Sequence, residues 1–344
     1  MWQVIGQEKN TTLLQRSLER EWLAHAYLLV GPPHVGKMTL ALDIARVLNC
    51  DSAESPCGEC LPCQKITAGN HADVQVINLA QREDTAGAKN ISTEQIKDMQ
   101  HAASLPPFEG KYKVFIIEGA ELLSIEAANR MLKTLEEPAE KMIFILLTTN
   151  EKLLPVTVVS RCQRLELNPM SPAALETVLQ DRWAVEPGRA KLLARLSHGC
   201  LGWAILADGD DELLQKRAEK LDALLEIIQG DDEERFSYAG QLSSLFSRRR
   251  GLLEEVLDMW VDWWRDLMLC KLGFPDMVTN VDRAEALETV SGGYNLAQIK
   301  TFIESIQAAG EQLRQNANPL LVLEVLMLDM PGKEKRGEKT VAAR

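Results

Sequence analysis

The stretch 26–39 constrains the fold more than any other part of the chain, and it has the sequence AYLLVGPPHVGKMT. Its first five residues form a short apolar run with a tyrosine and a valine, which is typical of a buried strand, and the run breaks at Gly31. From Lys37 onward the apolar residues recur with helical spacing, at Leu40, Ile44 and Leu48. The stretch therefore predicts a strand, a glycine-containing loop and a helix in direct succession.

The loop in this stretch has the pattern of a phosphate cradle. Gly31, Gly36 and Lys37 occupy the places that such a loop requires, because its N–H groups and the positive end of the helix bind phosphate while a lysine supplies a point charge. The next position normally carries a hydroxyl for Mg²⁺, but here it is Met38, whose thioether is a poor ligand for a hard cation. Thr39 lies one residue late, turned by about 100° on a helix. We therefore expect a pocket for ATP or ADP, whereas the sequence supports Mg²⁺ binding and efficient hydrolysis poorly.

A second local feature is a cluster of thiols. Four of the seven cysteines fall within one short segment, at Cys50, Cys57, Cys60 and Cys63. In a reducing compartment this spacing indicates a structural zinc site with four thiolate ligands rather than a pair of disulfides. Unligated structural cysteines are the alternative, which is weaker because a polar, turn-rich segment offers no core in which to bury four thiols.

Bulk properties exclude some classes of protein. The formal net charge of −12 argues against DNA binding over the whole surface, since counterion release requires concentrated lysine and arginine, although local basic patches stay open. The first residues lack the basic start and apolar core of a signal peptide, and no apolar run approaches the roughly eighteen residues of a membrane span. We therefore expect a soluble, cytoplasmic protein without membrane contact.

Strands and helices alternate in the first half of the chain. Further buried strands are expected at 73–79, 114–118 and 142–149, with helical patterns between them. Together with the cradle at the first turn, this order predicts an α/β fold with a doubly wound parallel sheet and ligands at the carboxyl ends of the strands.

Beyond Pro169 the strand signal disappears and helical periodicity takes over. A chain of 344 residues is long enough for two or three domains. We expect a P-loop sheet domain at 1–168, with the cysteine module at 50–63, and a small helical lid at 169–209. A larger all-helical domain should follow at 210–330, and a charged, disordered tail at 331–344.

The end of the central strand is unusual for a protein that hydrolyses nucleotide. Such a protein needs an acid there to hold Mg²⁺ and usually a carboxylate beside it to orient water. Glu118 stands where the metal-binding acid is expected, but its side chain is one methylene longer than that of aspartate. The alternative is that Glu118 is a solvated acid at a strand end. Gly119, at the position of the second acid, has no carboxylate. The absence of a general base typically costs about 10²–10⁴ in rate.

Several further motifs occur in a fixed order along the chain. They are AHAY at 24–27, the four cysteines, NRMLKTLEEP at 129–138, TTN at 148–150, SRC at 160–162 and NANP at 316–319. Each motif is weak or moderate by itself, but the ordered set resembles the bacterial DNA polymerase III clamp loader, an AAA+ family. The resemblance covers nearly the whole chain and implies an AAA+ P-loop domain, a lid and a C-terminal collar domain that assembles with other subunits.

Two kinds of subunit in this family share the pattern. The gamma/tau motor has the P-loop threonine and an Asp-Glu strand end, whereas the delta prime subunit is commonly degenerate in them. This chain departs from the motor pattern at Met38, Glu118 and Gly119, and segment 199–203 lacks the arginine with which the motor senses nucleotide. The departures favour the delta prime kind.

The resemblance also implies roles for residues near the strand ends. It places the Ser-Arg-Cys motif on a surface that faces a neighbouring subunit's nucleotide, where Arg161 would act in trans as an arginine finger and Ser160 would orient it. A guanidinium suits this role because it is permanently charged and bidentate to phosphate oxygens. An ordinary surface ion pair is the alternative for Arg161. Asn150 lies where the family's first sensor contacts the γ-phosphate, with a strand-end cap as the alternative.

The expected function is therefore that of a weakly active or inactive subunit of the polymerase holoenzyme. It would join gamma/tau and delta in the loader ring that opens the sliding clamp and loads it onto primed DNA. One alternative is an active gamma/tau-like motor in which Thr39 or water replaces the missing hydroxyl. The other is a freestanding DNA-binding AAA+ repair protein, which the charge of −12 disfavours.

Overall fold

The computed structural model describes residues 2–20, 22–79, 90–248 and 250–332. The chain divides into two compact units. The first, here called the sheet unit, consists of Met1–Ser171 and Gly199–Trp203, and the second, the helical unit, consists of Pro172–His198 and Ala204–Arg344.

The sheet unit contains one five-stranded sheet in the order β2-β3-β4-β1-β5, in which every neighbouring pair is parallel. Parallel neighbours require a crossover, and the helices between successive strands provide it. Because all strands run the same way, their carboxyl ends lie at one edge of the sheet. The strands are β1 (Ala26–Val30), β2 (Val74–Ile77), β3 (Lys113–Glu118), β4 (Met142–Thr148) and β5 (Gln163–Glu166).

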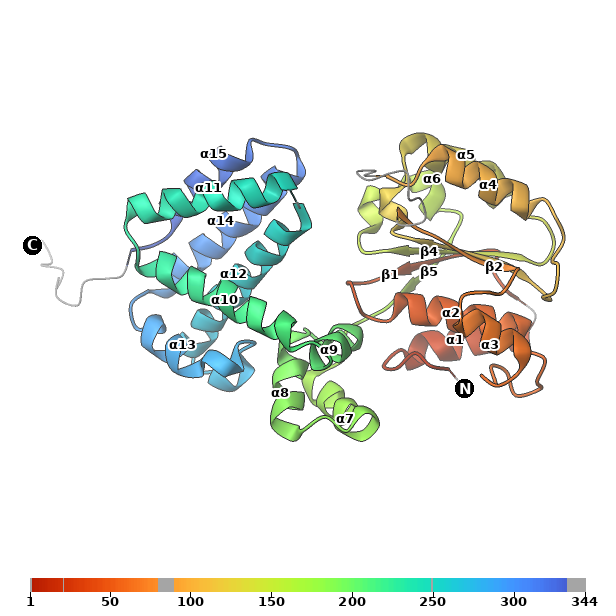
Figure 1. Ribbon diagram of the computed structural model, residues 1–344, viewed down its shortest axis with the longest axis horizontal. Coiled ribbons are helices and arrows are strands. Elements are labelled where there is room, and N and C mark those ends of the chain that lie inside the picture. Colours follow the sequence, from red (N-terminus) through yellow and green to blue (C-terminus); the bar gives the residue numbers. More distant parts are fainter. Residues whose placement is uncertain (1, 21, 80–89, 249, 333–344) are drawn as a thin grey trace, which may run out of the picture. The chain divides into compact units, whose positions relative to one another are not determined.

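Helices cover both faces of this sheet (Figure 1). Along β1, Tyr27 and Leu29 join one apolar cluster, whereas Ala26 and Leu28 join the other. This two-residue alternation with burial on both sides explains why the strand is a continuous apolar run. One face is covered by α1 (Glu8–Glu19), α2 (Lys37–Asn49) and α3 (Leu61–Thr67), and the other by α4 (Thr93–Ala103), α5 (Ile125–Glu136) and α6 (Val156–Val159).

The helix α2 is fixed from within by a buried ion pair. Asp43 Oδ1 lies 2.5 Å from Arg46 Nη2, and Asp43 Oδ2 accepts hydrogen bonds from the backbone N–H groups of Gln3 and Val4 at 2.8 Å each. Arg46 Nη1 in turn donates to Thr67 Oγ1 in α3 at 3.1 Å. The P-loop helix is thereby joined both to the N-terminal segment and to the helix that carries the last cysteine of the cluster.

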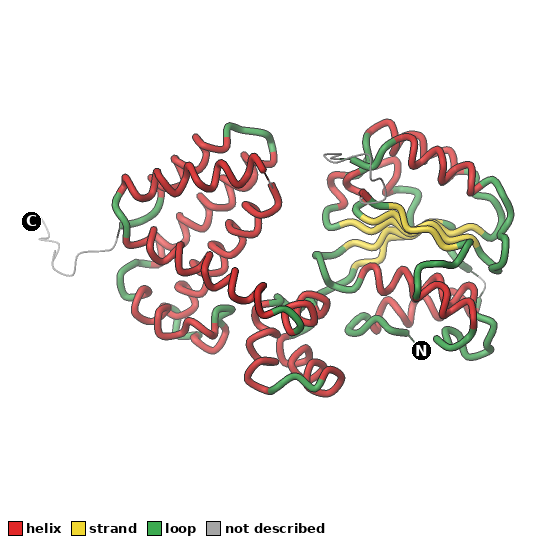
Figure 2. The backbone as a smooth tube through the Cα atoms, viewed as in Figure 1, coloured by secondary structure: helices red, strands yellow, loops and turns green. Residues whose placement is uncertain are grey.

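The helical unit consists of helices joined by loops (Figure 2), and buried tryptophans form part of its core. Trp260, Trp263 and Trp264 are fully buried, and Trp264 makes edge-on contacts with Tyr294 and Phe302 at centroid distances of 5.1 and 4.8 Å. The tryptophans are thus core residues. The helices are α7 (Pro172–Trp183), α8 (Pro187–Leu196), α9 (Leu201–Asp208, which begins in the sheet unit), α10 (Asp211–Gln229), α11 (Asp232–Arg248), α12 (Arg250–Lys271), α13 (Ala284–Ser291), α14 (Leu296–Arg314) and α15 (Pro319–Asp329).

The predicted fold class is confirmed, with a parallel P-loop sheet followed by helices alone. The region predicted as a small helical lid contains three short helices, α7, α8 and α9. The proposed boundaries of lid and collar stay predictions, and residues 333–344 of the expected tail lie outside the described residues. Among the described residues, none of the helices is both long enough and apolar enough to cross a membrane.

Candidate functional site

The glycine loop joins the carboxyl end of β1 to the first turn of α2, as predicted. Gly31 donates its N–H to Thr148 O at 3.2 Å, and a Cβ at Gly31 would lie only 2.7 Å from Leu167 O. Gly36 has a φ of 103°, a left-handed conformation that favours glycine. Both glycines are therefore required by the geometry of the loop, irrespective of any ligand.

The ammonium group of Lys37 is turned back onto the loop. Its Nζ donates to the carbonyl oxygens of Gly31 at 2.6 Å and Pro32 at 2.7 Å. Burial lowers the pKa of Lys37, and the charges of Glu121, Cys200 and Glu118 act in the opposite direction. The ammonium group that would bind a phosphate is therefore present in the loop, but in this structure it is hydrogen-bonded to two loop carbonyls.

The two residues after the lysine lie in the first turn of α2. The Met38 side chain packs against the apolar cluster beneath the sheet, and Thr39 is half-buried. The structure thus gives Met38 a packing role at the position where a cation ligand is expected.

The two acids near the cradle differ in their surroundings. Glu118 ends β3, is exposed and accepts a hydrogen bond from Asn78 Nδ2 at 3.1 Å. Glu121, in the short turn η2 (Ala120–Leu122), accepts from the N–H and hydroxyl of Thr149 at 3.1 and 2.6 Å. Burial opposes ionisation of Glu121, but these hydrogen bonds, together with those from its own backbone and from the Thr148 side chain, outweigh burial and hold its pKa below the ordinary value.

Sequence reasoning overlooked Glu121. Among the charged groups that raise the pKa of Lys37, its carboxylate has the largest effect, ahead of Cys200 and Glu118. The only signal in the sequence was a second acid three residues after the strand end, in a segment with a glycine that permits a sharp turn.

Asn150 lies just after β4 and caps the turn η3 (Glu151–Leu153). Its side-chain oxygen accepts from Lys152 N–H at 3.1 Å, and its own N–H donates to Thr148 Oγ1 at 3.1 Å. The predicted contact of Asn150 with phosphate stays a prediction, and the cap that was its alternative is present.

A further segment touches the loop from elsewhere in the chain. Gly202, in the first turn of α9, donates its N–H to His34 O at 3.0 Å, and a Cβ at this position would lie 2.8 Å from that oxygen. Cys200 is buried nearby, and burial raises the pKa of its thiol. In the sequence this segment is distinguished only by its lack of an arginine, whereas in the structure it packs directly on the loop.

Arg161 lies at the surface of the sheet unit, two residues after the end of α6. Its side chain is 34% exposed; Nη1 donates to Thr157 O at 2.9 Å, and Nη2 pairs with Glu136 Oε1 of α5. Ser160 is exposed, and its hydroxyl donates to the same carbonyl of Thr157 at 3.2 Å. The two side chains therefore share an acceptor, and the guanidinium remains accessible from outside the chain.

The four clustered cysteines converge as predicted. Their sulfur atoms all lie within 4.8 Å of one another, with Cys50 Sγ 3.6 Å from Cys57 Sγ and 3.8 Å from Cys60 Sγ. A tetrahedral zinc ion with Zn–S bonds of about 2.3 Å places sulfurs about 3.8 Å apart, so the spacing fits four-thiolate coordination.

The chemistry of the donors fits as well. The N–H groups of Ser52 and Cys60 donate to Cys50 Sγ at 3.4 Å and to Cys57 Sγ at 3.3 Å. Burial disfavours the Cys50 thiolate, yet hydrogen bonds from the backbone of Cys57 and Ser52 and from neighbouring thiols lower its pKa to about 6. Burial raises the pKa of Cys63 to about 12, so this thiol would lose its proton on binding the metal. The set of four is a candidate metal centre, and within the described residues no other group of cysteine, histidine and acidic side chains is arranged to hold a metal.

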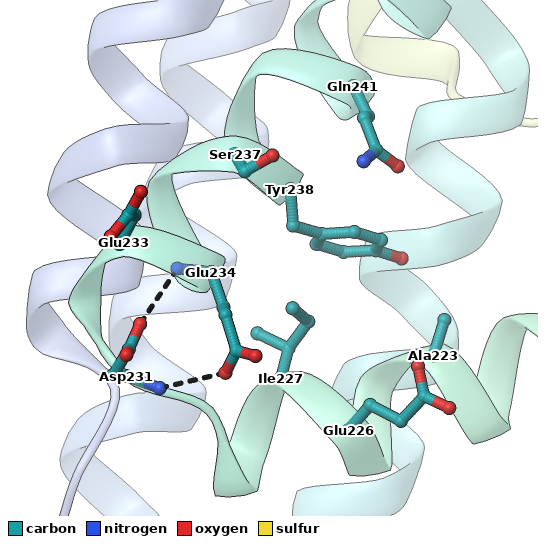
Figure 3. A pocket seen from close by; sticks show the side chains of 9 residues that line it. All are labelled: Ala223, Glu226, Ile227, Asp231, Glu233, Glu234, Ser237, Tyr238 and Gln241. Carbon is teal, nitrogen blue, oxygen red and sulfur yellow. Dashed lines mark hydrogen bonds between the residues drawn. The ribbon is translucent and has the colours of Figure 1, made fainter.

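The helical unit has a surface hollow of about 740 Å³ between α10 and α11 (Figure 3). Its acids include Asp231 and Glu234, which cap α11 reciprocally: Asp231 N–H donates to Glu234 Oε2 at 3.1 Å, and Glu234 N–H donates to Asp231 Oδ1 at 3.0 Å. These acids are thus accounted for by helix capping. The hollow contains none of the predicted site residues.

Comparison with known proteins gives matches along most of the chain. Residues 6–171 match the family described as DNA polymerase III, delta subunit, and residues 211–331 match its C-terminal counterpart. The delta' subunit of Bacillus subtilis is 29% identical over 92% of this chain and 93% of its own length. The tau subunit of the same organism is 29% identical over 94% of this chain, and that of Escherichia coli is 31% identical over 76%.

These relatives differ in how much of their length the chain spans. It spans 60% of the Bacillus tau subunit and 41% of the Escherichia coli tau subunit, but nearly all of the delta' subunit. The two family matches and these relatives agree on one assignment. The chain therefore belongs to the bacterial DNA polymerase III clamp-loader family, to which the delta' and gamma/tau subunits belong.

Proposed function

We propose that this chain is a delta prime subunit that completes the clamp-loader ring and supplies Arg161 to the ATP site of a neighbouring gamma/tau subunit. The observation that carries the proposal is the exposed guanidinium of Arg161, 34% accessible and paired only at the surface with Glu136. Such a group can reach a phosphate outside its own chain, where its planar fork fits phosphate oxygens.

The chain's own nucleotide pocket also supports a subunit that binds nucleotide but hydrolyses it weakly or not at all. Gly31, Gly36 and Lys37 form a cradle of the right order, and they would hold the phosphates of ATP or ADP. Bound nucleotide would supply the anion that competes with the carbonyls of Gly31 and Pro32 for Lys37. Hydrolysis would remain weak or absent because Met38 and Gly119 provide neither a Mg²⁺ ligand nor a general base.

The assembled function is loading of the sliding clamp onto primed DNA, in the cytoplasm, together with gamma/tau and delta subunits. The helices from α10 to α15 would form the collar that contacts the other subunits. This part of the proposal rests on the family to which the chain belongs.

The decisive experiment is Arg161→Ala in a loader reconstituted with gamma-type and delta subunits, sliding clamp and primed DNA. Turnover at the site that Arg161 serves is expected to fall by about 10³–10⁵. Arg164→Ala is the matched control, because Arg164 is also exposed and paired with acids, Glu151 and Glu166. Unchanged clamp- and DNA-stimulated ATPase in the Arg161→Ala loader would refute the trans role.

A structural zinc ion at Cys50, Cys57, Cys60 and Cys63 is the second part of the proposal. Zinc would tie the loop after α2 to α3, a stabilising role without catalysis. Metal analysis of the purified chain should find one zinc per chain. Cys60→Ser is expected to lower that content, whereas Cys270→Ser, which changes a lone cysteine, should not.

An active motor remains the second candidate, because the Bacillus tau subunit is as similar in sequence as the delta' subunit. It predicts Mg²⁺-dependent ATP turnover by the isolated chain that Lys37→Ala abolishes. Absence of turnover in the unmodified chain would remove this candidate.

A further inference from the structure

The surface of α1 has a hollow of about 690 Å³ that the proposed function does not use. It is formed by one side of the helix, by Arg20 and Trp22 just after the helix, and by the start of edge strand β5. Its lining consists of three cations and one acid together with polar and apolar side chains, namely Glu8, Lys9, Thr12, Leu13, Arg16, Ser17, Arg20, Trp22 and Gln163.

The cations of this hollow form a line. At 3.6 residues per turn, Lys9, Arg16 and Arg20, the residue that caps the end of α1, lie within about 40° of one another around the helix axis. Glu19 and Glu8 lie about 80–100° to one side, and Glu8 is the one acid at the rim of the hollow. Arg16 and Arg20 are one turn apart, about 6 Å along the axis. Among the residues that the structure describes, none of the three cations has a carboxylate partner, in contrast to Arg164 and Arg189, each of which has two.

Trp22 lies at the end of this line and is 77% exposed. Its backbone is tied to the end of α1, because the Trp22 backbone N–H donates to Ser17 O at 2.9 Å. Trp183 is 39% exposed, and Trp260, Trp263 and Trp264 are fully buried. A large apolar ring exposed to solvent beside cations without carboxylate partners is the combination that stacks on a base while the neighbouring charges bind phosphates.

We propose that this hollow binds single-stranded nucleic acid, with a base stacked on Trp22 and the phosphate backbone along Lys9, Arg16 and Arg20. An acidic peptide would satisfy the cations but would leave the ring without a stacking partner. In a duplex the bases are already stacked on each other, so the ring selects single strands. The overall charge of −12 confines the interaction to this patch and weakens it at high salt.

The test uses the full chain and a fluorescent oligothymidylate of about 16 nucleotides. Binding measured by anisotropy should weaken with salt, with a log–log slope of about −2 for three phosphate contacts at about −0.7 each. Arg16→Gln and Arg20→Gln should each remove about 0.7 from the slope. Trp22→Ala should lower affinity about 10- to 100-fold, as expected for loss of base stacking. Trp22→Phe should keep most of the affinity but lose the quenching of tryptophan fluorescence on binding.

Trp183→Ala and Arg182→Gln, in α7, are matched controls that should leave binding unchanged. The proposal is overturned if the chain fails to bind the oligonucleotide at low salt, if Trp22→Ala binds as well as the unmodified chain, or if oligoglutamate of equal length competes as well as oligothymidylate. It is also overturned if Trp22→Ala weakens only the association with a gamma-type partner. None of these outcomes depends on Arg161, so the proposal can fail separately from the proposed function.

Discussion

Two cations of the sheet unit, Lys37 and Arg161, have opposite surroundings. Lys37 donates to two carbonyls of its own loop, at 2.6 and 2.7 Å, and burial lowers its pKa. Arg161 is 34% exposed and is held by one backbone carbonyl and by the carboxylate of Glu136, itself half-exposed. The charge of Lys37 is therefore neutralised by carbonyls of its own loop, whereas the charge of Arg161 at the surface of the same unit is available to another molecule.

The largest expected effect is a difference in ATPase activity between variants of Lys37 and Arg161 in the same reconstituted loader. In the reconstituted loader, Lys37→Ala should leave stimulated turnover nearly unchanged, because the pocket of this chain contributes little hydrolysis, whereas Arg161→Ala should lower turnover at the neighbouring site by about 10³–10⁵. The measurement is ATPase per loader with clamp and primed DNA present. If Lys37→Ala is the more damaging change while the loader still assembles, the comparison is wrong and the chain is a motor.

A second effect concerns the rigidity of the cradle. Asp43→Ala removes the partner of buried Arg46 and the acceptor for the N–H groups of Gln3 and Val4, and should destabilise the sheet unit by about 3–5 kcal/mol. Urea unfolding measures the change. Asp51→Ala is the control, because Asp51 is 64% exposed and lies 3.9 Å from its lysine partner, so a change of about 0.5 kcal/mol or less is expected. Equal losses for both variants would show that the ion pair does not hold α2.

A third effect tests whether the missing carboxylate at Gly119 can simply be restored. Gly119 has a φ of 71°, and a Cβ there would lie 3.0 Å from Leu122 Cδ1. Gly119→Ala should therefore cost about 1–2 kcal/mol of stability, and Gly119→Glu should cost at least as much.

Gly240→Ala provides the matched contrast for this glycine. Gly240 lies within α11 with no atom near its missing Cβ, so the alanine should stabilise the chain by about 1 kcal/mol. Thermal unfolding measures whether each variant is less stable or more stable than the unmodified chain. If Gly119→Ala is as stable as the unmodified chain, the backbone does not exclude a side chain at this strand end.

Local patterns predicted much of this unit from the sequence. The cysteine cluster spans few residues, so its convergence follows from spacing and turn chemistry alone. The buried strands were visible because their apolar runs have no polar interruption. The glycine loop was visible because its glycines lie at fixed distances from Lys37.

Contacts between distant segments could not be predicted in this way. Glu121 meets Thr149 across 28 residues because β3 and β4 are neighbours in the sheet, and Gly202 meets His34 from a helix far along the chain. Neither contact leaves a periodic signal in the sequence. The exposure of Arg161 likewise depends on how α5 and α6 pack, so its accessibility became known only from the structure.

The smallest effect measures how loosely Arg161 is held. Both members of its ion pair are exposed, with 34% of the Arg161 side chain and 50% of the Glu136 side chain accessible, so Glu136→Gln should change the free energy of unfolding by less than about 1 kcal/mol. Loader turnover should also change little, because the guanidinium keeps its charge and its hydrogen bond to Thr157 O. Arg161→Lys sharpens the result: lysine keeps the charge but loses the planar fork, so turnover should fall while stability stays the same. A Glu136→Gln variant that is strongly destabilised would mean instead that Arg161 is a structural residue of its own chain, tied to α5 as firmly as Lys37 is tied to its loop.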